Sequence, residues 1–179
     1  MISLKSKNAQ KILSYFFLNS TNRAYINELA KLLDMDPKNT DRKLKELEKE
    51  GLLNSDFEGK QRYFFLNQEY PLLKEYKKIV LKTMGIEKEL KDVVAKDDKI
   101  ENAYIFGSYA KDNMDANSDI DLLLVGDHST METESKVRKL EKESEREINI
   151  VSFSKEEFEK KKKESFIKNI FENKIIKIK

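Results

Sequence analysis

Apolar residues recur every three or four positions in the segments 8–18, 25–33 and 37–50. This spacing places the apolar side chains on one face of each segment and predicts three amphipathic helices. Asp36 and Pro37 fit the start of the third helix, because Asp is a favoured N-cap and Pro is tolerated in the first helical turn. The first third of the chain is therefore expected to be mainly helical.

Two strand-like runs, 52–57 and 61–66, follow the third helix. The residues 58–60 between them are Glu-Gly-Lys, which is typical of a tight turn. The sequence thus predicts a β-hairpin directly after three helices.

This order of elements, with the stretch 42–53, resembles the winged helix-turn-helix domains of prokaryotic transcription regulators over about residues 4–67. In such domains the third helix enters the major groove, and the hairpin lies near the backbone or the minor groove. The resemblance implies double-stranded DNA as a partner. The side chains that it implies for DNA contact are Lys38, Asn39, Thr40, Arg42, Lys43, Lys60 and Arg62. Acidic residues dilute the charge of the helix, however, so a protein-interaction role for this fold stays open.

The segment 70–98 is weakly amphipathic, with an interruption expected at Gly85. It is interpreted as a bridge between domains or as a dimerisation helix, which would make the protein a homodimer. The expected parts are a winged helix-turn-helix domain at 1–69, this helical segment at 70–98, and a second domain at 99–179.

The run 119–125 begins with two carboxylates and continues with apolar residues typical of a strand. Side chains alternate along a strand, so Asp119 and Asp121 project from one face while Ile120 projects from the other. Two adjacent carboxylates repel each other and favour a shared cation. Oxygen ligands of this kind suit Mg²⁺, with waters and substrate phosphates completing its coordination.

A short apolar run, 103–106, leads into Gly107 and Ser108. Gly107 lets a phosphate approach the backbone, and Ser108 adds a hydroxyl and an N–H near a helix start. Phosphoryl and nucleotidyl transfer depend mostly on positioning and charge neutralisation, and two metal ions can stabilise the attacking and leaving oxygens together. The glycine turn and the acidic pair together provide these parts.

The segments 107–111 and 118–125, with the spacer between them, are similar to the signature of minimal nucleotidyltransferases in the DNA polymerase beta superfamily. The resemblance implies a small mixed-sheet α/β domain that takes a nucleoside triphosphate and Mg²⁺, with room for two ions. The phosphate-binding residues that it implies are Gly107, Ser108 and Lys111, and the catalytic metal ligands are Asp119 and Asp121. Asp112 departs from the glycine that many relatives carry in this loop.

The family usually carries a third carboxylate on a later strand, which here is the run 147–153. The apolar neighbours align that position with Asn149, which is neutral and cannot act as a base. Glu147 lies two residues earlier on the same face, and we take it as the candidate replacement. The substitution by Asn149 leaves catalysis in question.

The remaining segments fit an α+β protein. They predict a charged helix over 130–146, a helix from the capping box at Ser154 to about 165, a short helix over 166–171 and a strand over 174–178. His128, the one histidine, is interpreted as an ordinary loop residue.

The composition excludes some kinds of site and indicates where the protein is expected to be located. The chain has no cysteine, which excludes disulfides and thiolate metal sites, and its net charge of +2 does not by itself indicate a nucleic-acid partner. No apolar run approaches the ~20 residues that span a bilayer, so we expect a cytoplasmic protein with no membrane partner.

Two main functions follow. One is a Mg²⁺-dependent enzyme that transfers a nucleoside monophosphate to a hydroxyl acceptor and is tethered to a DNA-binding module. Antitoxin-like relatives modify a HEPN-type toxin, so the acceptor could be a protein. The other is a transcription regulator whose impaired nucleotidyltransferase-like domain senses nucleotide, which Asn149 favours. A third hypothesis is protein interaction by both domains.

Overall fold

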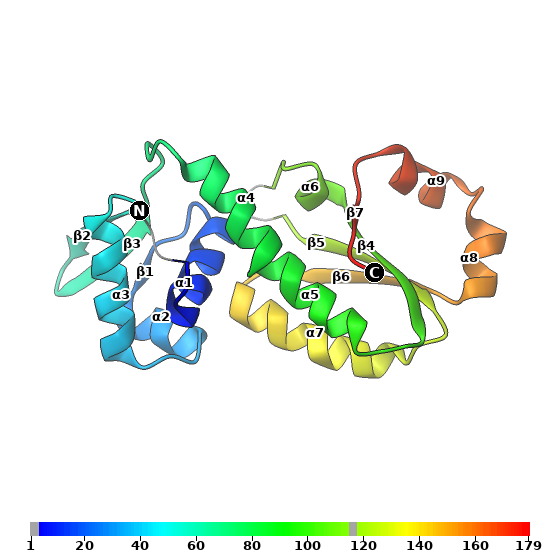
Figure 1. The fold of residues 1–179 in the computed structure, drawn as a ribbon, viewed down its shortest axis with the longest axis horizontal. Helices are drawn as coiled ribbons and strands as arrows, with labels where there is room; N and C mark the ends of the chain where they lie inside the picture. The colour runs from blue at the N-terminus through cyan, green and yellow to red at the C-terminus, as the bar shows by residue number, and fades with distance from the viewer. Residues whose placement is uncertain (1–3, 115–117) are drawn as a thin grey trace. The chain divides into compact units, whose positions relative to one another are not determined.

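The computed structural model describes residues 4–114 and 118–179. The chain forms two compact units, Met1–Lys88 and Glu89–Lys179, each of which combines helices with a small sheet (Figure 1). The α+β class expected from the sequence is confirmed. Within the described ranges, no helix is long and apolar enough to cross a membrane.

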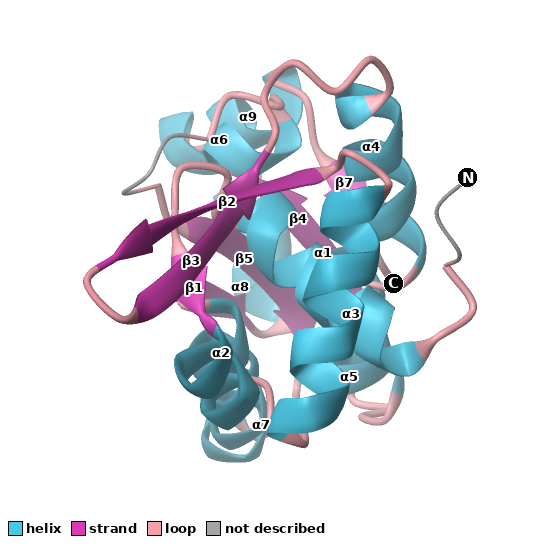
Figure 2. Cartoon of the chain, turned by 90° about the vertical axis from the view of Figure 1, so that its left-hand side faces the viewer, coloured by secondary structure: helices cyan, strands magenta, loops and turns pink. Residues whose placement is uncertain are grey.

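The first unit places helices around a three-stranded antiparallel sheet of order β1-β3-β2 (Figure 2). Helix α4 packs against α1 and so belongs to this unit. The elements are α1 Lys7–Leu18, β1 Ala24–Tyr25, α2 Ile26–Leu32, α3 Pro37–Lys49, β2 Leu53–Glu58, β3 Gln61–Leu66 and α4 Leu73–Thr83.

Local signals explain the path from α3 into the hairpin. The Asp36 carboxylate accepts a hydrogen bond from the backbone N–H of Asn39 over 2.9 Å, and Pro37 occupies the first helical position, as predicted. At the other end, Gly51 has φ +80°, a left-handed conformation that favours glycine and ends the helix. The chain can therefore turn directly into β2.

The core of the first unit is apolar and fully buried. Leu13 and Phe16 of α1, Leu44 of α3 and Phe64 of β3 each have 0% exposure. Burying a side chain of this size contributes about 1.5–3 kcal/mol. The helical periodicity seen in the sequence thus corresponds to the faces that build this core.

The second unit is built on a four-stranded sheet of order β6-β5-β4-β7. Strand β4 is antiparallel to both of its neighbours, whereas β5 and β6 are parallel and are joined through helix α7. The elements are α5 Ile86–Ala95, which begins just before the division between the units, β4 Ile100–Phe106, α6 Gly107–Ala110, β5 Ile120–Gly126, α7 Thr130–Ser144, β6 Ile148–Phe153, α8 Lys155–Lys161, α9 Ser165–Glu172 and β7 Ile176–Lys177.

The side chains of strand β5 alternate between the two faces of this sheet. Leu123 and Val125 pack with Ile170 of α9 on one face, while Ile120 and Leu122 are buried on the other. Asp121 shares the face of Leu123 and Val125 because side chains alternate along a strand. The alternation predicted for this strand therefore positions the carboxylate at the edge of an apolar cluster.

Three details refine the sequence prediction. Strand β1 was not predicted, because two residues are too few to show a period. The interruption expected at Gly85 is present between α4 and α5, where an added Cβ would lie 3.0 Å from Ser14 Oγ. The loop expected between Lys111 and Ser118 includes residues 115–117, which lie outside the described residues.

Candidate nucleotidyltransferase site

The sheet register brings the predicted catalytic segments together. In the antiparallel β4–β5 pair, Phe106 lies opposite Asp121, and in the parallel β5–β6 pair Asp121 lies beside Asn149. Gly107 follows Phe106 directly, so the glycine turn, the acidic pair and the third strand meet at one end of the sheet.

Gly107 packs its backbone against the Asp121 carboxylate. The residue has φ +72°, and a Cβ added there would lie 2.0 Å from Asp121 Oδ2. Such a distance is far shorter than any stable contact, and the left-handed conformation is itself costly for a residue with a side chain. The sequence therefore needs glycine here for both space and conformation.

The acidic pair is partly compensated by an amide. Asn149 Nδ2 donates a hydrogen bond to Asp119 Oδ2 over 3.1 Å. Burial raises the pKa of Asp121 above its ordinary value, and the negative charge of Asp119 raises it further, while a hydrogen bond from Asn149 opposes both effects. The carboxylates thus lie in a setting that disfavours two negative charges unless a cation is shared.

Glu147 does not complete a three-carboxylate site. Its side chain is exposed, and its backbone carbonyl accepts a hydrogen bond from the Ile120 N–H over 2.9 Å. Among residues 4–114 and 118–179, no three acidic or histidine side chains are grouped closely enough to hold a metal ion. The two aspartates alone fit one Mg²⁺ whose remaining ligands are waters and phosphate oxygens.

The residues predicted to bind phosphate lie in and around the short helix α6. Ser108 is half-buried within it, and Lys111 is exposed at its end. Asp112 has φ +56°, the left-handed conformation that a glycine would adopt without strain, and its carboxylate pairs with Lys174 over 2.8 Å. The ion pair links this turn to the segment before β7.

The α3 surface was the predicted DNA-contacting face. Lys38 and Asn39 are exposed there. Thr40 is not, because it has 0% exposure and its hydroxyl donates to the Asp36 carbonyl over 3.0 Å. The expectation that Thr40 lies on the outer face was therefore wrong; the residue closes the first turn of α3 from the inside.

Most of the charge on α3 is balanced within the helix. Lys43 forms an ion pair with Glu46, and this contact lowers the pKa of the Glu46 carboxyl. Arg42 approaches the same carboxylate more distantly, at 3.9 Å, and Lys45 pairs with Asp41 over 2.9 Å. Ion pairs between neighbouring turns of a helix contribute about 0.3–0.5 kcal/mol each, and these pairs leave little net positive charge on this surface.

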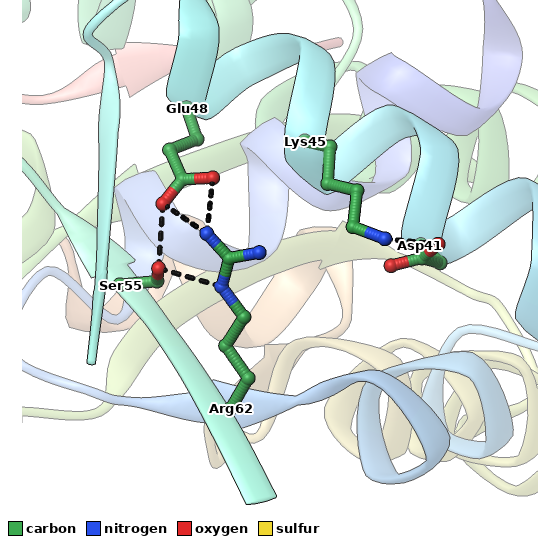
Figure 3. Close-up of polar contacts among 5 residues, drawn as sticks. All are labelled: Asp41, Lys45, Glu48, Ser55 and Arg62. Carbon is green, nitrogen blue, oxygen red and sulfur yellow. Dashed lines mark hydrogen bonds and ion pairs between the residues drawn. The ribbon is translucent and has the colours of Figure 1, made fainter. Parts of the chain in front are cut away.

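Arg62 of the hairpin is held by the protein itself (Figure 3). Its guanidinium donates to both carboxylate oxygens of Glu48 and to Ser55 Oγ, each over 2.8 Å. The same group lies over the rings of Phe57 and Phe64. Arg62 therefore joins β3 to the end of α3, whereas Lys60 at the hairpin turn is exposed.

His128 lies in the loop after β5, as predicted. Its Nδ1 is 3.0 Å from the Gly126 carbonyl oxygen, and its Nε2 is 3.2 Å from Ser152 Oγ. A carbonyl oxygen only accepts, so Nδ1 carries the proton in this pairing. The imidazole ties the end of β5 to β6, away from the acidic pair.

A model of the nucleotidyltransferase domain family matches residues 87–177, and the chain belongs to this family. A crystal structure from Sulfolobus solfataricus, described as a candidate nucleotidyltransferase, is similar at 21% identity over 41% of this chain and 68% of that chain, with a TM-score of 0.28. No curated protein matches the chain.

An aromatic pair beside the acidic residues was not singled out from the sequence. Phe106 and Phe166 meet edge to face, with ring centroids 6.5 Å apart. The signal available was the position of Phe106 directly before Gly107. Nothing in the local pattern indicated that α9 would bring Phe166 to the same place.

Proposed function

We propose that the second unit binds a nucleoside triphosphate with Mg²⁺ and transfers its nucleoside monophosphate to a hydroxyl acceptor. The observation that carries this proposal is the contact between Gly107 and Asp121. The backbone of the glycine turn approaches the Asp121 carboxylate closely, which supports one site that combines the turn proposed to bind phosphate with the carboxylate proposed to bind the metal.

Each residue then has a defined task. Gly107 lets the turn pass close to the Asp121 carboxylate, Ser108 offers its hydroxyl to a phosphate, and Lys111 adds a positive charge. Asp119 and Asp121 would hold the cation, which neutralises phosphate charge when bound. Glu147 is the candidate acceptor of the proton from the attacking hydroxyl, since Asn149 cannot take one.

A second candidate function rests on the Asn149–Asp119 hydrogen bond. An amide stands where the family resemblance implies a third acidic residue, and it donates a hydrogen bond to one of the two aspartates. A domain of this kind could retain nucleotide binding and transfer poorly, which would make it a nucleotide sensor. In that case, nucleotide binding by the second unit would regulate the activity of the first unit.

For the first unit we propose a winged helix-turn-helix that binds double-stranded DNA. The supporting features are the order of three helices and a hairpin, together with exposed Lys38, Asn39, Arg42 and Lys60. Lys43 is half-buried and paired, so we assign it a smaller part. The protein acceptor would be a HEPN-type toxin, and the assembly a homodimer.

The test measures, with Mg²⁺, the binding of each nucleoside triphosphate and the transfer of its label to cell extract and to a HEPN-type toxin. Wild type is compared with the isosteric pair Asp119→Asn, Asp121→Asn, and with Asp127→Asn, which removes an exposed charge beyond the far end of β5. Transfer that is lost only in the double variant supports the enzyme. Aspartate-dependent binding without transfer supports the sensor, and no aspartate-dependent binding contradicts both.

A further inference from the structure

Phe106 presents its ring on the face of the sheet that carries Asp121. The two residues are direct partners in the antiparallel β4–β5 pair, and such partners project to the same side. The ring also packs against the cluster formed by Leu123, Val125 and Ile170. Phe106 is therefore the last apolar side chain before the candidate phosphate and metal site.

Phe166 extends this apolar surface outward. It lies in the first turn of α9 and is 49% exposed, although its ring packs at 85° against that of Phe106. Phe171 on the same helix provides a contrast, because it contacts two rings, those of Tyr104 at 5.2 Å and Phe158 at 6.0 Å. Phe166 thus combines one supporting aromatic contact with a solvent-accessible surface.

We propose that the exposed surface of Phe166 stacks against the nucleobase of the bound nucleoside triphosphate. This inference rests on the proposed function, which places the phosphates at Gly107 and the cation at Asp121. Phe106 lies opposite Asp121 in the sheet and packs against Phe166, so a nucleotide with its phosphates anchored can direct its base toward Phe166. An aromatic ring held in place by a second ring is a suitable stacking surface, since little conformational freedom is lost on binding.

Stacking on Phe166 would also determine which nucleobases the site prefers. Every nucleobase has a π face, so a stacking surface accepts all four bases and favours purines through their larger rings. We expect ATP and GTP to bind more tightly than CTP and UTP. All four nucleotides should bind more tightly than inorganic tripolyphosphate, which has no base.

The experiment measures binding by calorimetry with Mg²⁺ for two ligands, an α,β-methylene analogue of ATP and inorganic tripolyphosphate. The full chain is compared as wild type, Phe166→Ala, Phe166→Leu and Phe166→Tyr. Leucine keeps apolar bulk without a π face, and tyrosine keeps the ring. The control is Met131→Ala, which removes another exposed apolar side chain, 81% accessible, on α7. Thermal unfolding verifies that α9 is intact in each variant.

We expect Phe166→Ala and Phe166→Leu to weaken binding of the ATP analogue about tenfold. Phe166→Tyr and Met131→Ala should bind it as wild type does, and tripolyphosphate should bind equally to all folded variants. Unchanged analogue binding in Phe166→Ala, or equal losses for both ligands, would overturn the inference and leave the proposed function standing. Failure of wild type to bind either ligand would overturn the proposed function and this inference with it.

Discussion

Asn149 donates its side-chain amide to Asp119 across 3.1 Å while lying beside Asp121 in the parallel register of β5 and β6. The amide therefore reaches the same two carboxylates that a divalent cation would share. It relieves part of their repulsion without adding a negative charge. A third carboxylate at this position would add one more metal ligand and more repulsion.

The change Asn149→Asp tests this relationship. In the presence of Mg²⁺ we expect tighter metal binding and nucleotidyl transfer about tenfold faster or more, because a base and a ligand for a second ion are gained. With chelator present, the variant should be less stable than wild type by roughly 1 kcal/mol, since like charges then lie side by side. Metal titration, initial rates and thermal unfolding with and without Mg²⁺ provide the readouts.

Asn149→Ala is the matched control for that prediction. It removes the amide without adding charge, so transfer should not rise, and the stability of the metal-free protein should fall slightly as Asp119 loses its donor. A rise in transfer in both variants would show that the amide merely obstructs the site. No change in metal binding on Asn149→Asp would contradict the assigned position of the cation.

Gly107→Ala should disrupt the site through space as well as conformation. The added Cβ would lie 2.0 Å from Asp121 Oδ2, so the carboxylate or the turn must move, and nucleotide binding should fall below detection. Gly59→Ala is the control, because Gly59 has φ +61° but nothing within 4 Å of an added Cβ. Gly59→Ala should therefore show only the backbone cost of the left-handed conformation, about 1–2 kcal/mol.

Denaturant unfolding of both variants separates the two effects. We expect Gly107→Ala to lower the free energy of unfolding of its own unit by roughly 2–3 kcal/mol, the backbone cost plus the clash. Equal losses of unfolding free energy in the two variants would mean that the Asp121 side chain moves aside without an energetic cost.

Some features of the candidate site could be predicted from the sequence, and others could not. The spacing of Gly107, Asp119 and Asp121 gave the turn, the strand and the shared face, because these follow from local periodicity and from a family resemblance whose family is now confirmed. The Asn149 hydrogen bond and the Phe106–Phe166 contact depend on which strands and helices become neighbours. Those are tertiary relationships that no local pattern encodes.

In the first unit, too, the roles of polar and charged side chains depend on tertiary contacts that the sequence does not show. Thr40 is polar and falls among exposed residues of α3, yet it turns inward because its hydroxyl can bond the carbonyl four residues earlier. Arg62 was predicted to contact DNA, whereas Glu48 lies within reach only once the hairpin folds against α3. Side-chain partners that are distant in sequence decide such roles.

Arg62 and Lys60 are expected to respond differently to alanine substitution. Arg62→Ala leaves the partly buried Glu48 carboxylate without its main donor and removes a ring contact, so the first unit should lose roughly 1–2 kcal/mol of stability. Lys60→Ala should leave stability unchanged and weaken binding to a DNA duplex, with a smaller salt dependence. Denaturation and duplex binding at two salt concentrations measure both effects. DNA binding that is unaffected by Lys60→Ala, Lys38→Ala and Arg42→Ala together would exclude the proposed DNA-binding surface.

The capping box of α8 gives a pH-dependent prediction. The Ser154 backbone N–H donates to the Glu157 carboxylate over 3.0 Å, and this bond, together with a smaller contribution from the Ser154 side chain, holds the pKa of Glu157 below its ordinary value. A carboxyl with a depressed folded-state pKa stabilises the fold above its ordinary pKa, and the contribution is lost as the pH falls through the folded pKa. Glu157→Gln, which keeps the hydrogen-bond geometry, should therefore be less stable than wild type at neutral pH and equal to it in acid. An NMR titration of the Glu157 carboxyl checks the cause directly. Ser154→Ala removes the hydroxyl but keeps the backbone N–H, so it should move the pKa only part of the way back toward the ordinary value. An unshifted pKa in wild type would refute the proposed role of this cap.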